Sequence, residues 1–193
     1  MSTVTMRLEN AFSVDVPPHR AWSVLLDMPL VVSCMPGAEL IETVDDSHWR
    51  MGLTVKLGPV SLVFDADLER EFADPAARRM VMTSKARERK GRGGATARVE
   101  STLEPEGEGS RVVIVTDVNL SGTAAQFGRP VVQDVSRQLT ARFATCLEAK
   151  LGTVDSAPAA PGQSAERPQA VSGLSLLVRT LVSSVTRLFR PRR

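Results

Sequence analysis

The sequence predicts an α+β fold in which a curved antiparallel sheet of about seven strands wraps around one long C-terminal helix. Residues 122–151 repeat their apolar side chains at helical spacing, whereas most of the chain before them alternates apolar and polar residues. Such alternation is typical of strands with one buried face, and short turns between the strands indicate antiparallel neighbours. A single long amphipathic helix covering that face gives a two-layer α+β arrangement.

The predicted long helix carries a continuous apolar stripe that covers roughly a third of its circumference. The stripe consists of Phe127, Val131, Val132, Val135, Leu139, Phe143, Cys146, Leu147 and Leu151. At 1.5 Å per residue, a helix of about 25 residues is roughly 38 Å long and can lie across a whole small domain. We therefore expect the sheet to curl around this stripe, and such an arrangement commonly encloses a cavity.

The first strand is expected over residues 6–16, where alternate side chains are apolar. Asn10 is the exception, because it is a polar residue on the apolar face. Two prolines then end the strand and start a short helix, since proline is tolerated at the first helical position. A second short helical turn is expected over 30–35.

Further strands follow in order along the chain. They are expected over 40–44, 47–57, 60–69, 78–89, 95–103 and 112–120. Their inner faces combine flexible methionines with small residues, namely Met51, Met80, Met82, Ala66, Ser84, Ala86, Ala95 and Ala97. Small residues leave room and methionine adapts to irregular apolar shapes, which favours a ligand cavity. The same residues would also suit a helix packed closely on the sheet, so a cavity and a filled core remain alternatives at this point.

Charge is distributed unevenly along the chain. Residues 167–193 contain six arginines and no acidic residue, whereas residues 1–166 contain 18 basic and 22 acidic residues. The body is mildly acidic and the tail is basic, so we expect an anionic partner for the tail alone.

The two cysteines, Cys34 and Cys146, are not spaced as metal ligands and lie in no disulfide framework. The first ten residues contain no apolar run of signal-peptide length, so a cytoplasmic protein is expected. Neither His19 nor His48 is placed to activate Cys34 as a nucleophile. A tight, packed corner is the expected role of the segment 34–37.

No constellation of residues predicts catalysis, and we expect a protein that is not an enzyme. The carboxylates Asp65, Asp67 and Glu69 lie on the outward face of one strand, where they are expected to be solvated. The basic residues of 85–92 also point outward, and no aromatic residues lie among them. They are expected to pair with the acidic neighbouring strand rather than with nucleic acid. No metal motif is present.

Three motifs carry a family resemblance. They are Cys34-Met35-Pro36-Gly37-Ala38 after the helix containing 21–27, Gly58-Pro59-Val60 before a strand with Phe64, and 122–129 before a helix with Phe143 and Leu147. Together they resemble the family of the carbon monoxide dehydrogenase G subunit, within the START-like helix-grip superfamily, over residues 6–151. The resemblance implies a helix-grip domain with a lipophilic pocket. It also implies a membrane-associated, non-catalytic accessory protein that recruits or electrically couples a molybdenum hydroxylase such as carbon monoxide dehydrogenase.

The C-terminal region divides into two expected parts. Residues 152–170 are rich in Pro, Ala and Ser and are expected to form a flexible linker after the domain at 1–151. Residues 171–193 are expected to form a basic amphipathic helix on an anionic membrane. Its membrane-binding residues would be Leu174, Leu177, Leu181, Val185, Leu188, Phe189, Arg179, Arg187 and Arg190. A transmembrane helix is disfavoured, since Arg179 would lie near its middle. An apolar stripe would also suit docking on the protein's own domain or in a groove of a partner protein.

We hypothesise that the cavity binds a respiratory quinone such as menaquinone, because molybdenum hydroxylases release electrons and bacterial membranes carry quinone acceptors. The expected lining residues are Asn10, Met51, Leu53, Phe64, Met80, Met82, Ala97, Phe127 and Val131. Asn10 would offer the polar head group a hydrogen bond, although a bond to a buried backbone group or water is an equal alternative. The protein is expected on the inner face of the cell membrane, with no covalent cofactor. A tether or maturation factor without a ligand is the alternative function.

Overall fold

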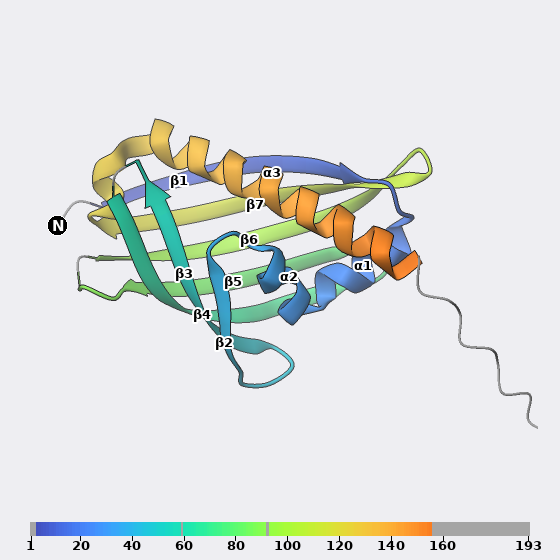
Figure 1. Cartoon of the computed structure of the whole chain (residues 1–193), viewed down its shortest axis with the longest axis horizontal. Helices are drawn as coiled ribbons and strands as arrows, with labels where there is room; N and C mark the ends of the chain where they lie inside the picture. The colour runs from blue at the N-terminus through green and yellow to red at the C-terminus, as the bar shows by residue number, and fades with distance from the viewer. Residues whose placement is uncertain (1–2, 59, 92, 156–193) are drawn as a thin grey trace, which may run out of the picture. The chain divides into compact units, whose positions relative to one another are not determined.

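Seven strands form one antiparallel sheet in the spatial order β1-β7-β6-β5-β4-β3-β2, which confirms the predicted sheet (Figure 1). The strands are β1 Thr3–Val14, β2 Ala38–Thr43, β3 His48–Leu57, β4 Val60–Asp74, β5 Arg79–Glu88, β6 Gly93–Glu106 and β7 Gly109–Gly122. This computed structural model describes residues 3–58, 60–91 and 93–155. The tail helix expected at 171–193, with all its expected membrane-binding residues, lies outside the described residues.

The helical segments are α1 Pro18–Leu26, α2 Met28–Cys34, the 3₁₀ turn η1 Ala124–Phe127 and α3 Gly128–Asp155. Figure 1 shows α3 crossing one face of the curved sheet, with α1 and α2 on the same side near its C-terminal half. The helix α2 begins earlier than expected because Asp27 caps it. The Asp27 Oδ1 atom accepts a hydrogen bond from the backbone N–H of Leu30 at 3.0 Å.

The long helix starts later than the sequence pattern predicts. Gly122 ends β7, and the segment that follows it forms η1 rather than the first turns of α3. Gly128 then has a φ of +73°, outside the range of an α-helix, and the absence of a Cβ allows this backbone conformation. The change of direction at Gly128 lets the chain leave the sheet before α3 runs back across it.

The apolar and polar faces of the strands are confirmed. On the inner face, Ala66, Ala86, Ala95 and Leu120 pair in a row across β4, β5, β6 and β7. On the outer face, opposite charges pair between neighbouring strands as the sequence predicts. The Nη2 atom of Arg89 lies 2.7 Å from Asp65 Oδ1, and the Nε atom of Arg50 lies 3.4 Å from Asp67 Oδ1.

The two edges of the sheet differ in what lies beside them. The helix α3 packs against β1, and Arg129 Nη2 donates a hydrogen bond to the Thr5 carbonyl oxygen at 3.2 Å. At the other edge, β2 is six residues long and pairs only with β3. Its register shifts between Leu40 and Glu42.

Buried apolar residues form three clusters. The C-terminal cluster, which includes the end of α3, contains Val14, Val16, Ala21, Leu25, Cys34, Leu103, Val112, Phe143, Leu147 and Leu151. The η1 cluster contains Met6, Leu8, Leu57, Leu62, Phe64, Val118, Leu120, Ala124 and Ala125. The α2 cluster contains Met28, Val32, Trp49, Met51 and Ala66. The core therefore consists of three groups of side chains: one at the C-terminal end of α3, one at η1 and one at α2.

Candidate functional site on the inner face of the sheet

Burial changes along the apolar stripe of α3. In the C-terminal half, Phe143 is 6%, Leu147 0% and Leu151 2% exposed. In the N-terminal half, Val135 and Leu139 are half-buried although they continue the same stripe, and Val131 is 37% exposed. The second half of the helix is thus embedded in the core, whereas the first half retains exposed apolar surface.

The middle of the sheet is also incompletely covered. Met82, Ser84, Ala97, Val99 and Thr116 lie at inward positions of β5, β6 and β7, and all are half-buried. We call these five residues, together with Val135 and Leu139 of α3, the central inner surface.

Two members of the central inner surface stand apart from the core. Val99 of the sheet and Leu139 of the helix belong to none of the three clusters and pack against none of them. Well-packed interiors leave few apolar side chains without apolar neighbours. Ala97 and Val135 pack against the η1 cluster and Met82 packs against the α2 cluster, so the incompletely covered part of the central inner surface centres on Val99 and Leu139.

Hydroxyl groups interrupt this apolar surface. Ser84 and Thr116 make no side-chain hydrogen bond within the described residues. Each hydroxyl can donate one hydrogen bond and accept others, so the surface could meet the carbonyl or hydroxyl groups of a lipophilic molecule.

The nine expected cavity residues fall into different places. Leu53, Phe64, Ala97 and Phe127 come together in or against the η1 cluster, while Met51 and Met82 belong to or pack against the α2 cluster. Met80 is 5% exposed and, like Val131, joins none of the clusters. Asn10 lies at the junction of β1 and α3, where its Nδ2 atom donates a hydrogen bond to Ser136 Oγ at 2.9 Å.

Of two hollows in the described part of the protein, the first includes Ser84 and Ala97 of the central inner surface and the second includes none of its residues. One, of about 270 Å³, is lined mainly by outward-facing residues of β1, β5, β6 and β7, among them Thr5, Lys85 and Thr96. The other, of about 220 Å³, is a polar hollow between β1 and α3 that includes Asn10 and Ser136. Asn10 therefore borders a polar recess at the edge of the sheet.

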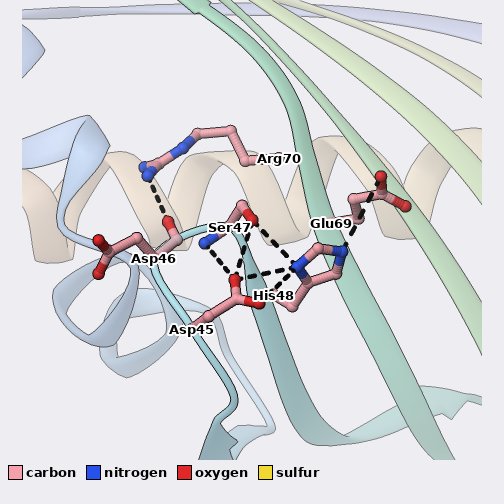
Figure 2. Close-up of polar contacts among 6 residues, drawn as sticks. All are labelled: Asp45, Asp46, Ser47, His48, Glu69 and Arg70. Atoms are coloured by element: carbon pink, nitrogen blue, oxygen red, sulfur yellow. Dashed lines mark hydrogen bonds and ion pairs between the residues drawn. The ribbon is translucent and has the colours of Figure 1, made fainter.

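A polar cluster in the β2–β3 turn contains serine, histidine and aspartate (Figure 2). Ser47 Oγ lies 2.8 Å from Asp45 Oδ1, and His48 Nδ1 lies 2.9 Å from the same oxygen. In a nucleophilic triad one histidine nitrogen faces serine and the other faces aspartate. Here His48 meets both residues through Nδ1, which lies 3.0 Å from Ser47 Oγ, and Asp45 also contacts Ser47 directly. The backbone N–H of Ser47 and the His48 side chain lower the pKa of Asp45 far below its usual range. The cluster caps an exposed turn.

Arg70 is a structural residue that the sequence analysis did not identify. Its Nη1 atom donates to the carbonyl oxygen of Leu26 at the end of α1, at 3.3 Å, and its Nη2 atom donates to the carbonyl oxygen of Asp46 (Figure 2). The guanidinium carbon lies 5.2 Å from the ring centroid of Trp49, a cation–π contact. Arg70 therefore joins α1, the β2–β3 turn and the α2 cluster. The sequence signal for this role was a basic residue at a position of β4 that faces inward.

The two cysteines form a covalent link. Cys34 and Cys146 form a disulfide between the last residue of α2 and the C-terminal half of α3, with their Cα atoms 5.3 Å apart. The sequence analysis found no disulfide framework around the two cysteines and so did not predict this bond. The pairing spans 112 residues of sequence, and two cysteines without a repeated spacing carry no framework pattern. The only sequence signals were that Cys146 lies on the apolar stripe of the long helix and that Cys34 lies in an expected packed corner.

Comparison with known proteins identifies the family. A family model for the carbon monoxide dehydrogenase G subunit (CoxG) matches residues 11–152. The chain belongs to this family. No curated protein matches the sequence. Within the residues that the structure describes, no helix of this CoxG family member is long and apolar enough to cross a membrane.

Solved structures with the same fold come from several bacteria. A conserved protein from Geobacillus kaustophilus is 17% identical, with a TM-score of 0.69 over 77% of this chain and 96% of its own. A Thermus thermophilus protein is 16% identical, with a TM-score of 0.56 over 77% of this chain and 99% of its own. The Zhui aromatase/cyclase from Streptomyces is 14% identical, with a TM-score of 0.57 over 80% of this chain and 98% of its own. At these identities the likeness shows the helix-grip fold alone.

Proposed function

We propose that this CoxG family member is a non-catalytic accessory protein of a molybdenum hydroxylase of the carbon monoxide dehydrogenase type. In this proposal it associates with the inner face of the cell membrane. It binds a lipophilic ligand, a respiratory quinone such as menaquinone, and so couples the dehydrogenase to the electron transport chain. Family membership supports the accessory role.

The observation that carries the ligand proposal is the unequal burial of the α3 stripe. Leu147 is fully buried, whereas Leu139, two turns earlier on the same stripe, remains half-buried and faces no core cluster. An isoprenoid chain lying against the central inner surface would bury this apolar area. At about 25 cal/mol per Å², covering about 150 Å² contributes on the order of 4 kcal/mol. Ser84 and Thr116 would offer hydrogen bonds to the quinone oxygens.

Filling the central inner surface tests the ligand proposal. Ala97→Phe should abolish quinone binding, because the new ring occupies the space above β6. Overpacking typically costs about 1–3 kcal/mol, so the domain should remain folded. Ala11→Phe is the matched control, since Ala11 is exposed on the outer face of β1. The measurement is solvent extraction of the purified protein followed by mass spectrometry, together with titration of menaquinone into the extracted protein.

The outcomes separate the two functions. Quinone in the wild-type protein and in Ala11→Phe, but not in Ala97→Phe, would support the coupling role. If the wild-type protein contains no quinone and binds none when it is added, the ligand role is rejected and the tether or maturation role remains.

Membrane association is proposed for residues 171–193, which lie outside the described residues. Deleting them should remove binding to vesicles that contain anionic lipid, because the apolar stripe and the arginines are lost together. Reversing the charges of Arg187 and Arg190 should weaken binding, most strongly at low salt. Vesicle co-sedimentation measures both effects. Equal binding by the truncated and full-length proteins would reject this part of the proposal.

A further inference from the structure

The disulfide joins two sulfur atoms in unequal surroundings. Cys34 is 4% exposed and belongs to the C-terminal cluster together with Leu147. Cys146 is only half-buried and packs against the margin of the same cluster. A thiolate that attacks a disulfide must approach one sulfur from outside, so accessibility decides which sulfur is attacked. Cys146 is the more accessible of the two residues.

The disulfide ties α3 to a helix, α2, whose residues belong to two of the three clusters. Met28 and Val32 of α2 belong to the α2 cluster, while Cys34 of the same helix belongs to the C-terminal cluster. Val31 packs against both clusters. The helix α2 thus connects the part of the core beneath the end of α3 with the part that covers β3 and β4.

The disulfide is the only covalent link between α2 and α3 other than the main chain, because the protein contains no further cysteine. Noncovalent packing also holds α2, and α2 contacts both α3 and β2. Removing the disulfide would therefore leave α2 folded against the core but able to detach from it transiently. Weakly held elements of native proteins open locally in this way.

We propose that Cys34 and Cys146 form a thiol–disulfide exchange site for an external dithiol, and that the state of this pair controls how fast a lipophilic ligand reaches the central inner surface. A thiolate of the dithiol attacks Cys146 Sγ, and Cys34 Sγ leaves as a thiolate that takes up a proton. The second thiol of the dithiol then attacks the dithiol sulfur of the mixed disulfide and releases Cys146 as a thiolate that takes up a proton. The protein gains two electrons and two protons, and the dithiol is oxidised to a disulfide.

The first half of this proposal stands on the disulfide alone, whereas the gating half rests on the proposed function. Disulfides of proteins in the cytoplasm, where this protein is proposed to act, are usually transient and redox-sensing rather than structural. Reduction would loosen α2 from α3 and so speed ligand exchange.

Thiol reactivity tests the exchange site in the full-length protein. In Cys34→Ser the remaining Cys146 should react with Ellman's reagent at least about ten times faster than Cys34 does in Cys146→Ser, because Cys34 is buried. The native protein should also yield two thiols after treatment with dithiothreitol without denaturant. Equal reactivity of the two variants, or a disulfide that resists dithiothreitol until the protein unfolds, would overturn the exchange site.

Ligand exchange tests the gating half without any reductant present. The probe is a naphthoquinone with a methyl group and a decyl chain on its quinone ring, and quenching of the Trp22 and Trp49 fluorescence reports its binding. The double variant Cys34→Ala/Cys146→Ala should release the probe at least about five times faster than the oxidised wild-type protein. Val112→Ala is the control, because it weakens the C-terminal cluster without removing the disulfide. It should release the probe at the wild-type rate.

Equal release rates in the double variant and the wild-type protein would overturn the gating half, as would an equal acceleration by Val112→Ala. If no form binds the probe, the proposed ligand role fails and the gating half fails with it. The thiol measurements then decide the exchange site separately. Far-UV circular dichroism confirms that each variant is folded before its rates are compared.

Discussion

The two halves of α3 carry the same apolar stripe and play different structural parts. The C-terminal half is held by the buried residues Phe143 and Leu147 and by the disulfide at Cys146. The N-terminal half keeps Val135 and Leu139 half-buried. The comparison teaches that a helical apolar stripe reports which way side chains face, but not whether anything packs against them. Val135 still packs against the η1 cluster, whereas Leu139 packs against no cluster, so the part of the stripe around Leu139 is the candidate for binding.

The largest expected effect compares one leucine from each half. Leu147→Ala should lower the free energy of unfolding by about 4 kcal/mol, because it leaves a cavity in a fully buried site. Leu139→Ala should lower it by less than about 1 kcal/mol, because its side chain is half-exposed and outside the clusters. Urea unfolding of the two full-length variants measures both values.

Similar losses in the two variants would break this comparison. They would show that the N-terminal half of α3 is packed as tightly in solution as the C-terminal half, and the central inner surface would then be ordinary core.

A smaller effect is expected from removing the disulfide. Replacing both Cys34 and Cys146 with alanine should lower the free energy of unfolding by about 3 kcal/mol, because the cross-link restricts a long loop in the unfolded chain. Urea unfolding of the oxidised wild-type protein, the reduced wild-type protein and the double variant measures the change. The reduced protein and the double variant should agree. A loss below about 1 kcal/mol would show that noncovalent packing alone holds the C-terminal half of α3.

The smallest effect concerns a region distant from the stripe. Asp45 has a folded-state pKa below its usual value of 3.8, so its contribution to stability is present above about pH 4 and is lost as the pH falls further. Asp45→Asn should therefore be less stable than the wild-type protein at pH 6, and this difference should shrink at pH 3. Thermal unfolding at both pH values measures it. A constant difference between pH 6 and pH 3 would contradict the pKa shift.

Much of the fold follows from patterns that a sequence displays directly. Alternation in segments such as 60–68 predicts which side chains of β4 face inward, because a strand has a period of two residues. The start of α3 was predicted too early, because the residues of η1 fit the helical pattern. Only the positive φ at Gly128 shows that the chain turns there before α3 begins.

The features that the sequence analysis missed depend on contacts between distant segments. The disulfide needs α2 and the end of α3 to meet, and Arg70 needs α1 and the β2–β3 turn to approach one strand. Neither of these contacts produces a repeating pattern of apolar and polar residues within one segment of the sequence. The uneven burial of the α3 stripe is similar, because it depends on where Val99 and Leu139 lie relative to three separate clusters. For the candidate site, the sequence therefore indicated the inward residues but not the gap between the clusters.

The open edge of the sheet has a consequence for the protein at high concentration. An unpaired strand can join the edge of another molecule and begin aggregation. The strand β2 limits this risk, because it is short, has a register shift after Leu40, and carries the charged residues Glu39 and Glu42, of which Glu42 pairs with Arg50 at 2.9 Å. These features offset the exposed Ile41, which is 55% accessible. Replacing Glu39 and Glu42 with threonine would remove both charges from the edge and leave it suited to forming fibrils.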